Sequence, residues 1–464
     1  MRGSAAKLPC YTDAARGPRM DRATLATTPG IQRSQWRVII LSSLGGALEF
    51  YDFVIYSMFA AYIGAAFFPA TDPFDTQIRS FSVFAVGYLA RPLGGLIFSH
   101  FGDKYGRRRV FIVSMLSMSL ATIGMGLLPG QATLGPAAAV LMVLLRLIQG
   151  FSLGGELPGA ITFVVENAPR TAGFAAGFIF FCVNSGVALA SALSLGVHEV
   201  LAEPEIASWG WRIGFLFGGV LGLVSFWLRL SLHETPEFQL LRKNAANVPF
   251  VELFRTHPAQ VLIGISAMVA TAGFNGLLFA MPAYLPTAMG YTPVEAIQAQ
   301  NICLVILSFG LLTAAWVGDR IPRRWILGTG GLILMVLSIP FFTAAANHSV
   351  GLFILFAGAG VAASLVNGPM SGVAADLFPT RIRFSGVAIS FNLAFSIFSG
   401  IAPLMAALLQ RSTGSPVGPA YYMCLCGLLT FVGSLFLHRY DGRILHDHRA
   451  AADAGAQAPS FPAQ

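Results

Sequence analysis

The sequence has few charged residues. Asp, Glu, Lys and Arg make up 11% of its 464 residues, whereas a soluble domain has about 25%. Apolar residues make up 55%, and the mean hydropathy is +0.69. This composition excludes an ordinary soluble domain and predicts a membrane protein. The formal charge of +8 does not indicate a nucleic-acid partner, because the basic residues lie in short loops between apolar runs.

The sequence also lacks the motifs of several functional classes. Its five cysteines and eight histidines show no metal-ligand spacing. We find no nucleotide-binding strand–loop–helix and no pairing of a nucleophile with a base. No apolar stretch follows the first residues, so we expect no cleavable signal peptide. The sequence therefore predicts no cofactor, no metal site and no enzymatic activity.

Apolar segments long enough to cross a bilayer fill most of the chain. The longest break between them, residues 231–259, separates two sets of six. We therefore predict an all-α membrane protein with two six-helix bundles, 38–230 and 260–438, a cytoplasmic linker at 231–259, a disordered tail at 1–37 and a second tail at 439–464. The twelve segments are 38–68, 80–101, 110–128, 137–165, 172–197, 212–230, 260–285, 296–317, 325–346, 350–376, 386–410 and 419–438.

The basic residues predict the orientation of the chain. With the N-terminus inside, 24 of the 29 Lys and Arg residues fall on the cytoplasmic side. Loops rich in Lys and Arg stay on that side of a membrane. We therefore expect both termini in the cytoplasm and a multi-pass protein of the cell (inner) membrane.

Two charged hairpins occupy matching places in the two sets. Residues 102–109 (GDKYGRRR) form a turn bracketed by glycines after the second segment, and residues 318–324 (GDRIPRR) follow the eighth. Their aspartates, Asp103 and Asp319, are 216 residues apart, close to half the chain. A charged turn that recurs at half the chain length predicts a duplicated membrane bundle.

Together with the motif 146–150 (RLIQG) in the fourth segment, these features resemble the major facilitator superfamily. The stretches 47–53 (ALEFYDF), 91–95 (RPLGG) and 150–156 (GFSLGGE) are similar to its metabolite:proton symporter branch. That branch includes importers of proline and betaine, α-ketoglutarate, citrate and shikimate. The resemblance covers about residues 38–440 and implies two bundles that open alternately to each side.

The resemblance also implies a cytoplasmic gate of charged residues at helix ends. An aspartate of each hairpin would face the positive N-terminus of a helix of the other bundle, segment eleven or segment five. An arginine of each hairpin would face the acid that ends segment four or segment ten. The alternative is a plain loop that only sets topology. The expected gate residues are Asp103, Arg107 and Glu166 in the first half and Asp319, Arg323 and Asp376 in the second.

Five ionisable residues lie within apolar segments of the first half: Glu49, Asp52, Arg91, Arg146 and Glu156. Such residues are costly in a bilayer and usually face a partner or a water-filled cavity. We expect Asp52 and Glu49 to form the proton-coupling site, with Arg146 as their counter-ion and Arg91 or Arg146 meeting an anionic substrate. The alternative is a static ion-pair network. Glu156 is expected to be structural, with a share in coupling as the alternative.

Neutral polar residues in apolar segments are candidates for substrate contact. Tyr56 continues the face of Glu49 and Asp52. Buried amides also bond helices to one another, so packing is the alternative. Pro282 and Pro286 are expected to break segment seven near its outer end. The candidate substrate contacts, besides the two arginines, are Tyr56, Asn184, Asn275, Tyr284, Asn367 and Asn392.

These features predict a secondary active transporter that imports a small organic acid, such as citrate or α-ketoglutarate, by proton symport and alternating access. A proton-coupled importer of a zwitterion such as proline or betaine is the alternative. A drug:proton antiporter is a further alternative, but segment five has no proline between residues 173 and 196, where such proteins usually carry a Gly-Pro pair. The expected partners are a small molecule, protons and the lipid bilayer, without nucleic acid, and we expect a monomer.

Overall fold

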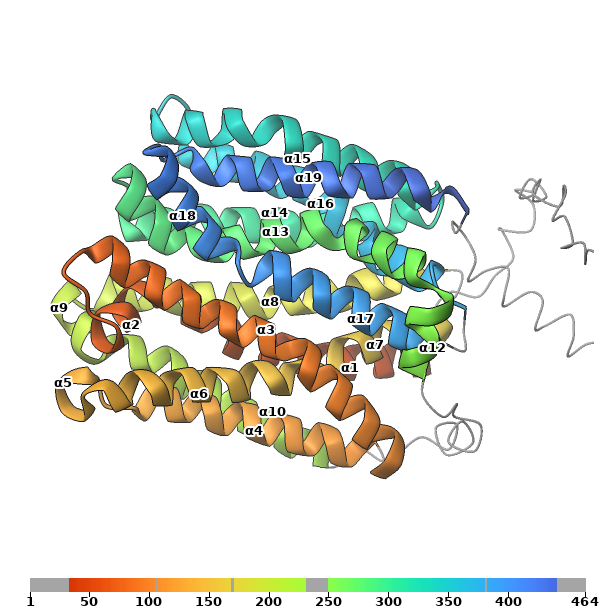
Figure 1. Ribbon diagram of the computed structural model, residues 1–464, viewed down its shortest axis with the longest axis horizontal. Coiled ribbons are helices and arrows are strands. Elements are labelled where there is room, and N and C mark those ends of the chain that lie inside the picture. The colour runs from red at the N-terminus through yellow and green to blue at the C-terminus, as the bar shows by residue number, and fades with distance from the viewer. Residues whose placement is uncertain (1–32, 106, 168–170, 231–248, 380–381, 440–464) are drawn as a thin grey trace, which may run out of the picture.

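The computed structural model describes the chain except residues 1–32, 106, 168–170, 231–248, 380–381 and 440–464, and it omits some side chains near these gaps. The described residues form helices and short connections, with no strand among them (Figure 1). This is what a bilayer demands, because a helix satisfies its own backbone hydrogen bonds. The elements are α1 (Arg33–Met58), α2 (Ala60–Phe67), α3 (Pro73–Tyr105), α4 (Arg107–Leu127), α5 (Gln131–Leu134), α6 (Pro136–Leu153), α7 (Glu156–Asn167), α8 (Ala172–Val200), α9 (Glu203–Glu205), the π-helix η3 (Ile206–Gly210), α10 (Trp211–Leu230), α12 (Pro249–Thr256), α13 (Pro258–Met289), α14 (Pro293–Gly318), α15 (Arg323–Ala346), α16 (Leu352–Asp376), α17 (Arg383–Ala394), the π-helix η5 (Phe395–Ser399), α18 (Ala402–Thr413), α19 (Gly418–Leu435) and the 3-10 helix η6 (Phe436–Arg439).

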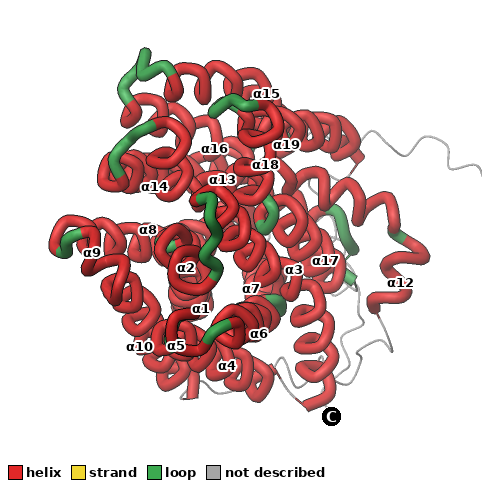
Figure 2. The backbone as a smooth tube through the Cα atoms, turned by 60° about the vertical axis from the view of Figure 1, so that its left-hand side comes forward, coloured by secondary structure: helices red, strands yellow, loops and turns green. Residues whose placement is uncertain are grey.

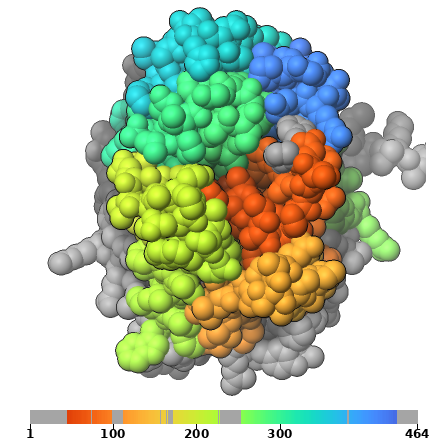
Figure 3. All heavy atoms as spheres, turned by 90° about the vertical axis from the view of Figure 1, so that its left-hand side faces the viewer, coloured from red at the N-terminus to blue at the C-terminus, as the bar shows by residue number. Residues whose placement is uncertain are grey.

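The long helices run side by side in two groups. Elements up to α10 gather in one part of the molecule, and α13 to α19 gather in the other (Figures 1 and 2). We call these groups the N-terminal and C-terminal bundles. They touch through α8 with α14, α1 with α13, and α3 with α18. A view onto one end shows elements of both bundles meeting across the middle of that face (Figure 3).

The membrane spans agree with the segments expected from the sequence. Ten described helices are long and apolar enough to cross a bilayer, and α1 with α2 forms a further pair bent by 63°. A shorter apolar helix, Ile112–Leu127, lies in α4. Each of the twelve expected segments overlaps one of these elements. The expected linker contains α12, and α1 begins at Arg33 rather than at residue 38.

The structure shows several local features that the sequence did not indicate. Segment one bends between α1 and α2 at Phe59. Segment four divides at Gly154 and Gly155, between α6 and α7, and the π-helix η5 interrupts segment eleven. The first hairpin does not turn at Gly102, because α3 continues through it to Tyr105.

The expected break of segment seven does not occur. Helix α13 continues through Pro282 and Pro286 to Met289. Because Pro282 has no N–H, it cannot bond the carbonyl of Leu278 four residues earlier. The side-chain amide of Gln300, on α14, donates to that carbonyl at 3.1 Å. The neighbouring helix thus satisfies the backbone group that the proline leaves open, as is common in membrane bundles.

Glycines bring two helices of the N-terminal bundle, α3 and α6, into backbone contact. A Cβ on Gly94 would lie 1.8 Å from the carbonyl oxygen of Phe151, and one on Gly150 would lie 1.8 Å from that of Gly87. Any side chain there would separate α3 from α6. This close approach places Arg91 of α3 and Arg146 of α6 deep in the bundle, where both are 0% exposed.

Candidate functional site

Arg91 lies on α3 among aromatic rings. Its guanidinium carbon is 5.3 Å from the ring centre of Tyr88, 5.8 Å from Phe50 and 6.0 Å from Phe53. It is also 5.6 Å from the ring of Phe391, which belongs to α17 of the C-terminal bundle. Its three guanidinium nitrogens are buried and have no hydrogen-bond partner among the described atoms. Arg91 is therefore a buried cation at the contact between the bundles that has ring faces but no hydrogen-bond acceptor.

Arg146 of α6 points inside the N-terminal bundle. Its guanidinium carbon is 4.0 Å from the ring centre of Phe53 and 4.8 Å from that of Tyr56. One terminal nitrogen donates to the carbonyl of Phe53 at 3.0 Å and to the side-chain oxygen of Gln149. Arg146 thus has two acceptors in its own bundle, both at one nitrogen, while its Nε and its other terminal nitrogen are buried without a partner among the described atoms.

Asp52 faces α10 and α4. The Cβ that Gly218 lacks would lie 2.4 Å from the first carboxyl oxygen of Asp52, and that of Gly222 would lie 3.1 Å from the second and 2.3 Å from the hydroxyl of Ser119. Asp52 is 2% exposed, and its Oδ1 has no hydrogen-bond partner among the described atoms. Two glycines one turn apart on α10 therefore make the space that this carboxyl group occupies.

The expected ion pair between Asp52 and Arg146 is not formed in this structure, which describes both side chains. Gln149 links the two residues instead. Its amide donates at 2.9 Å to the backbone carbonyl of Asp52 and at 2.8 Å to the hydroxyl of Thr122, while its oxygen accepts from Arg146. The carboxyl group of Asp52 points to the α10 glycines, so it does not meet the guanidinium.

Glu49 interacts with a different arginine from the one expected. It is 6% exposed, one turn before Asp52 on α1, and it lies within electrostatic reach of Arg91. The two carboxylates of α1 therefore have different neighbours: Glu49 lies near Arg91, and Asp52 lies against α10. The side chain of Glu156 lies outside the described residues.

One end of the molecule carries a set of charged contacts around Asp319, which links the two bundles. The backbone N–H groups of Gly173 and Phe174, at the start of α8, each donate to the carboxylate of Asp319 at 2.9 Å. Arg323 contacts Asp319 at 2.7 Å and Asp376 at 2.5 Å. We call this set the Asp319 contact. An anion at a helix N-terminus is favoured by the helix dipole and the unpaired N–H groups there. The other three expected gate residues, Asp103, Arg107 and Glu166, lie outside the described side chains.

The opposite end has contacts between the bundles that the sequence did not indicate. Asp75 of α3 pairs with Arg411 of α18. The amide of Gln77, also on α3, donates at 3.2 Å to the carbonyl of Ala283 on α13. With the Asp319 contact at the other end, the two bundles touch at both ends, and the residues around Arg91 are enclosed.

Comparison with known proteins identifies the family. The model of the Major Facilitator Superfamily matches residues 42–403, with a second match over 263–457. The chain belongs to this superfamily. Helical content, the two bundles and the expected twelve spans are confirmed by its likeness to solved members. One is a D-xylose-proton symporter (TM-score 0.69, 18% identity, covering 88% of this chain and 98% of that one). Another is a proton:xylose symporter bound to 6-bromo-6-deoxy-D-glucose (TM-score 0.71, 17% identity, covering 90% and 98%).

Curated relatives cover nearly the same length. The Proline/betaine transporter of Escherichia coli (strain K12) is 33% identical over 432 residues, which are 90% of this chain and 86% of that protein. The transporter of the same name from Salmonella typhimurium is 32% identical over the same shares. This superfamily member is therefore a multi-pass membrane protein, and its relatives are transporters. Their names agree with the zwitterion alternative better than with the organic-acid expectation.

The remaining expected substrate contacts of this superfamily member are spread over several places. Asn275 donates to Asn367 at 3.2 Å within the C-terminal bundle. Tyr56 donates to the carbonyl of Ser80 at 3.3 Å, and Tyr284 donates to that of Pro416 at 2.9 Å. Each of these four side chains thus has a partner in its own bundle.

Two other amides have an unsatisfied atom. Asn392, on α17, donates at 2.8 Å to the carbonyl of Gly154 in the other bundle, and its side-chain oxygen has no partner among the described atoms. The amide nitrogen of Asn184, on α8, is likewise buried without an acceptor in the described part. These two side chains keep hydrogen-bonding capacity on helices that contact the other bundle.

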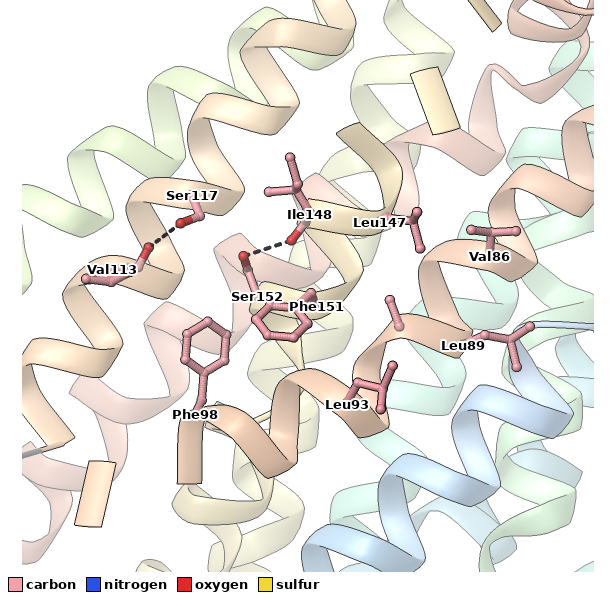
Figure 4. A pocket seen from close by; sticks show the side chains of 11 residues that line it. Val86, Leu89, Leu93, Phe98, Val113, Ser117, Leu147, Ile148, Phe151 and Ser152 are labelled. Carbon is pink, nitrogen blue, oxygen red and sulfur yellow. Dashed lines mark hydrogen bonds between the residues drawn. The ribbon is translucent and has the colours of Figure 1, made fainter. Parts of the chain in front are cut away.

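A large apolar groove lies elsewhere, on the surface formed by α3, α4 and α6 (Figure 4). Its volume is about 550 Å³, and Leu89 and Leu93 on its wall are exposed. The two hydroxyls in it, Ser117 and Ser152, donate to carbonyls of their own helices at 2.7 Å and 2.9 Å. The lining is otherwise apolar, so the groove suits lipid chains better than a polar solute.

Proposed function

We propose that this chain imports a zwitterionic osmolyte of the proline or betaine type by proton symport. The identity of about one third over 90% of the chain to two proline/betaine transporters supports this substrate class. The organic-acid expectation depended on two buried arginines that would both meet a polyanion. One terminal nitrogen of Arg146 donates to Phe53 and Gln149, whereas Arg91 has no acceptor at any of its three guanidinium nitrogens among the described atoms. A single such cation suits one carboxylate.

We assign proton coupling to Asp52, and we assign to Glu49 a second protonation in the transport cycle that frees Arg91 for the substrate. Asp52 is 2% exposed and lies in a space bounded by glycines rather than by cations. An ionised carboxylate in such a place is costly, so it favours the protonated form until water or a cation reaches it. Glu49 lies within reach of Arg91 and would compete with a substrate carboxylate for that guanidinium. Protonation of Glu49 would therefore favour substrate binding.

We assign the Asp319 contact to the cytoplasmic gate. The Lys and Arg distribution supports a cytoplasmic position for this end and for both termini, in the cell (inner) membrane. Breaking the two N–H bonds between α8 and Asp319 would let the bundles separate at this end while the contacts of Gln77 and Arg411 hold the other. Alternating access of this kind is a rocking of one bundle against the other around a fixed central site.

The observation that carries the proposal is the unsatisfied guanidinium of Arg91 between the bundles, in a chain so similar to proline/betaine transporters. Its test is uptake of labelled glycine betaine, proline, citrate and α-ketoglutarate into proteoliposomes, with and without an imposed inward proton gradient. We expect the gradient to accelerate uptake of the first two solutes and not of the other two. Gradient-driven citrate or α-ketoglutarate uptake would contradict the substrate class, and uptake of betaine indifferent to the gradient would contradict symport.

A matched pair of variants separates coupling from general damage. Asp52→Asn removes the proton-accepting group from α1 without changing its size. Glu199→Gln makes the same chemical change on the exposed end of α8. We expect the first variant to lose gradient-driven uptake and the second to keep it. Equal uptake in the two variants would remove Asp52 from coupling.

A further inference from the structure

The surroundings of Arg91 include an aromatic wall shared by both bundles. Phe50 and Phe53 come from α1, Tyr88 comes from α3, and all three ring centres lie within 6.0 Å of the guanidinium carbon. The C-terminal bundle contributes Phe391 at 5.6 Å. Rings at these distances attract a cation through their electron-rich faces. The wall is therefore assembled only when the two bundles are together.

Further rings from both bundles surround Phe391 and extend the wall. Phe391 stacks on Phe395 of η5 with their ring centres 4.3 Å apart. Phe180, on α8, lies 6.2 Å from Phe391. A π-helix such as η5 inserts an extra residue into a turn and often marks a functional site. Here it lies directly after the helix that carries Phe391.

The aromatic wall and the open guanidinium suit different ends of one molecule. The three nitrogens of Arg91 can hold a carboxylate through two parallel hydrogen bonds. The ring faces attract a cation but give an N–H group no strong acceptor. A cation without N–H groups would lose nothing by facing them.

We propose that Arg91 binds the substrate carboxylate and that Phe391 and Tyr88 receive a fully alkylated ammonium group, so that the site selects N-methylated zwitterions. This inference rests on the proposed function, because it concerns the same central site. It goes further by assigning each end of the substrate to named residues. It also states which chemical feature of the substrate the rings select.

The test is a series in which only methylation changes: glycine, sarcosine, dimethylglycine and glycine betaine. Each is used unlabelled to compete with gradient-driven uptake of labelled proline in proteoliposomes. Each added methyl group removes one N–H donor and buries one carbon. We therefore expect the inhibition constant to fall about fourfold or more per methyl group, the transfer value of one methylene.

Variants separate the two ends of the substrate. In Phe391→Leu, we expect glycine betaine to bind about fivefold more weakly or worse, with glycine changed less than about twofold. Tyr88→Leu repeats the test from the N-terminal bundle, and Tyr88→Phe keeps the ring as its control. Arg91→Lys should weaken all four compounds by the same factor, about tenfold, because Lys cannot form the two parallel bonds. Phe356→Leu, in a buried ring contact of α16 away from the site, should change nothing.

The outcomes distinguish this inference from the proposed function. Gradient-driven proline uptake with a flat or reversed methylation series would overturn the inference and leave the function in place. A steep series that both ring variants preserve would overturn the assignment to Phe391 and Tyr88. Absence of gradient-driven uptake of both labelled proline and labelled glycine betaine would overturn the proposed function and this inference with it.

Discussion

Replacing Asp319 with Asn tests whether the Asp319 contact holds the bundles together. The substitution keeps the size of the side chain but removes its charge and one of its two acceptor oxygens. In the structure these oxygens accept one N–H each, from Gly173 and Phe174, at 2.9 Å. The ion pair of Asp319 with Arg323 lies within the C-terminal bundle, so it persists when the bundles separate. Of the contacts that Asp319 makes, the two N–H bonds are therefore the ones that are lost when the bundles separate.

The size of the effect follows from those two bonds. A hydrogen bond to a charged group contributes about 1.5–3 kcal/mol. The side chain of Asp319 is 7% exposed, so solvent screens these bonds little. Asn can still accept one weaker bond, so we expect a loss of about 2–3 kcal/mol. At about 1.4 kcal/mol per factor of ten, the closed population falls about 30- to 150-fold relative to the open one.

Distances between spin labels measure this population. Labels at Arg320, after α14, and at Thr171, before α8, lie on the two sides of the contact, and the five native cysteines are replaced first. Asp319→Asn should move most of the distance distribution to the longer separation. Glu295→Gln is the control: this acid caps the other end of α14 by accepting from the backbone of Thr292 at 2.9 Å, within one bundle. Unchanged distances in Asp319→Asn, or the same shift in the control, would refute the gate.

Three further predictions concern uptake of labelled betaine. Asp52→Asn should make uptake independent of an imposed proton gradient while exchange of internal for external substrate continues; gradient-dependent uptake in this variant would contradict its role. Gly218→Ala places a Cβ 2.4 Å from Asp52 and should slow initial uptake by about tenfold, an overpacking cost of about 1–3 kcal/mol, whereas Gly358→Ala, with nothing within 4 Å, should not; equal rates would show that the space around Asp52 is unimportant. Asp75→Asn should change the uptake rate less than about fivefold, because an exposed ion pair contributes at most about 1 kcal/mol; a loss comparable to that of Asp319→Asn would contradict this ranking of the two ends.

Hydropathy predicts the spans of this chain because each must be apolar over the thickness of the bilayer. It could not predict where the helices end or bend. Helix α3 runs through the polar residues after Gly102, where composition changes but the backbone pattern does not. The bend at Phe59 has no proline or glycine beside it to announce it. Pro282 is the opposite case. A proline within a helix predicts a break, but the helix continues because the amide of Gln300, on another helix, satisfies the carbonyl that the proline leaves without a donor.

For the candidate site too, the sequence predicts which residues matter but not what they contact. The cost of burying charge predicts that Asp52, Arg91 and Arg146 are special, because apolar segments rarely contain such residues. Their partners depend on which helices pack together, which one sequence does not state. Gln149 stands in the quoted motif 146–150, yet its link to the backbone of Asp52 requires α1 and α6 to be in register. The ring of Phe391 reaches Arg91 from more than half the chain away.

The substrate class could not be predicted from the arginines alone. Two buried arginines suggest a polyanion if both are open to it. The structure gives Arg146 two acceptors in its own bundle and leaves Arg91 among rings. The relatives then favour a zwitterion. The monomeric state remains a prediction.

The central claim is that a proton enters with each zwitterion through Asp52. The most direct measurement is proton flux into proteoliposomes that enclose a pH-sensitive dye, with glycine betaine added outside and no gradient imposed. Our account predicts acidification of the interior on addition of betaine, and no acidification in Asp52→Asn. Betaine accumulation in the wild-type protein without any change in internal pH would contradict it.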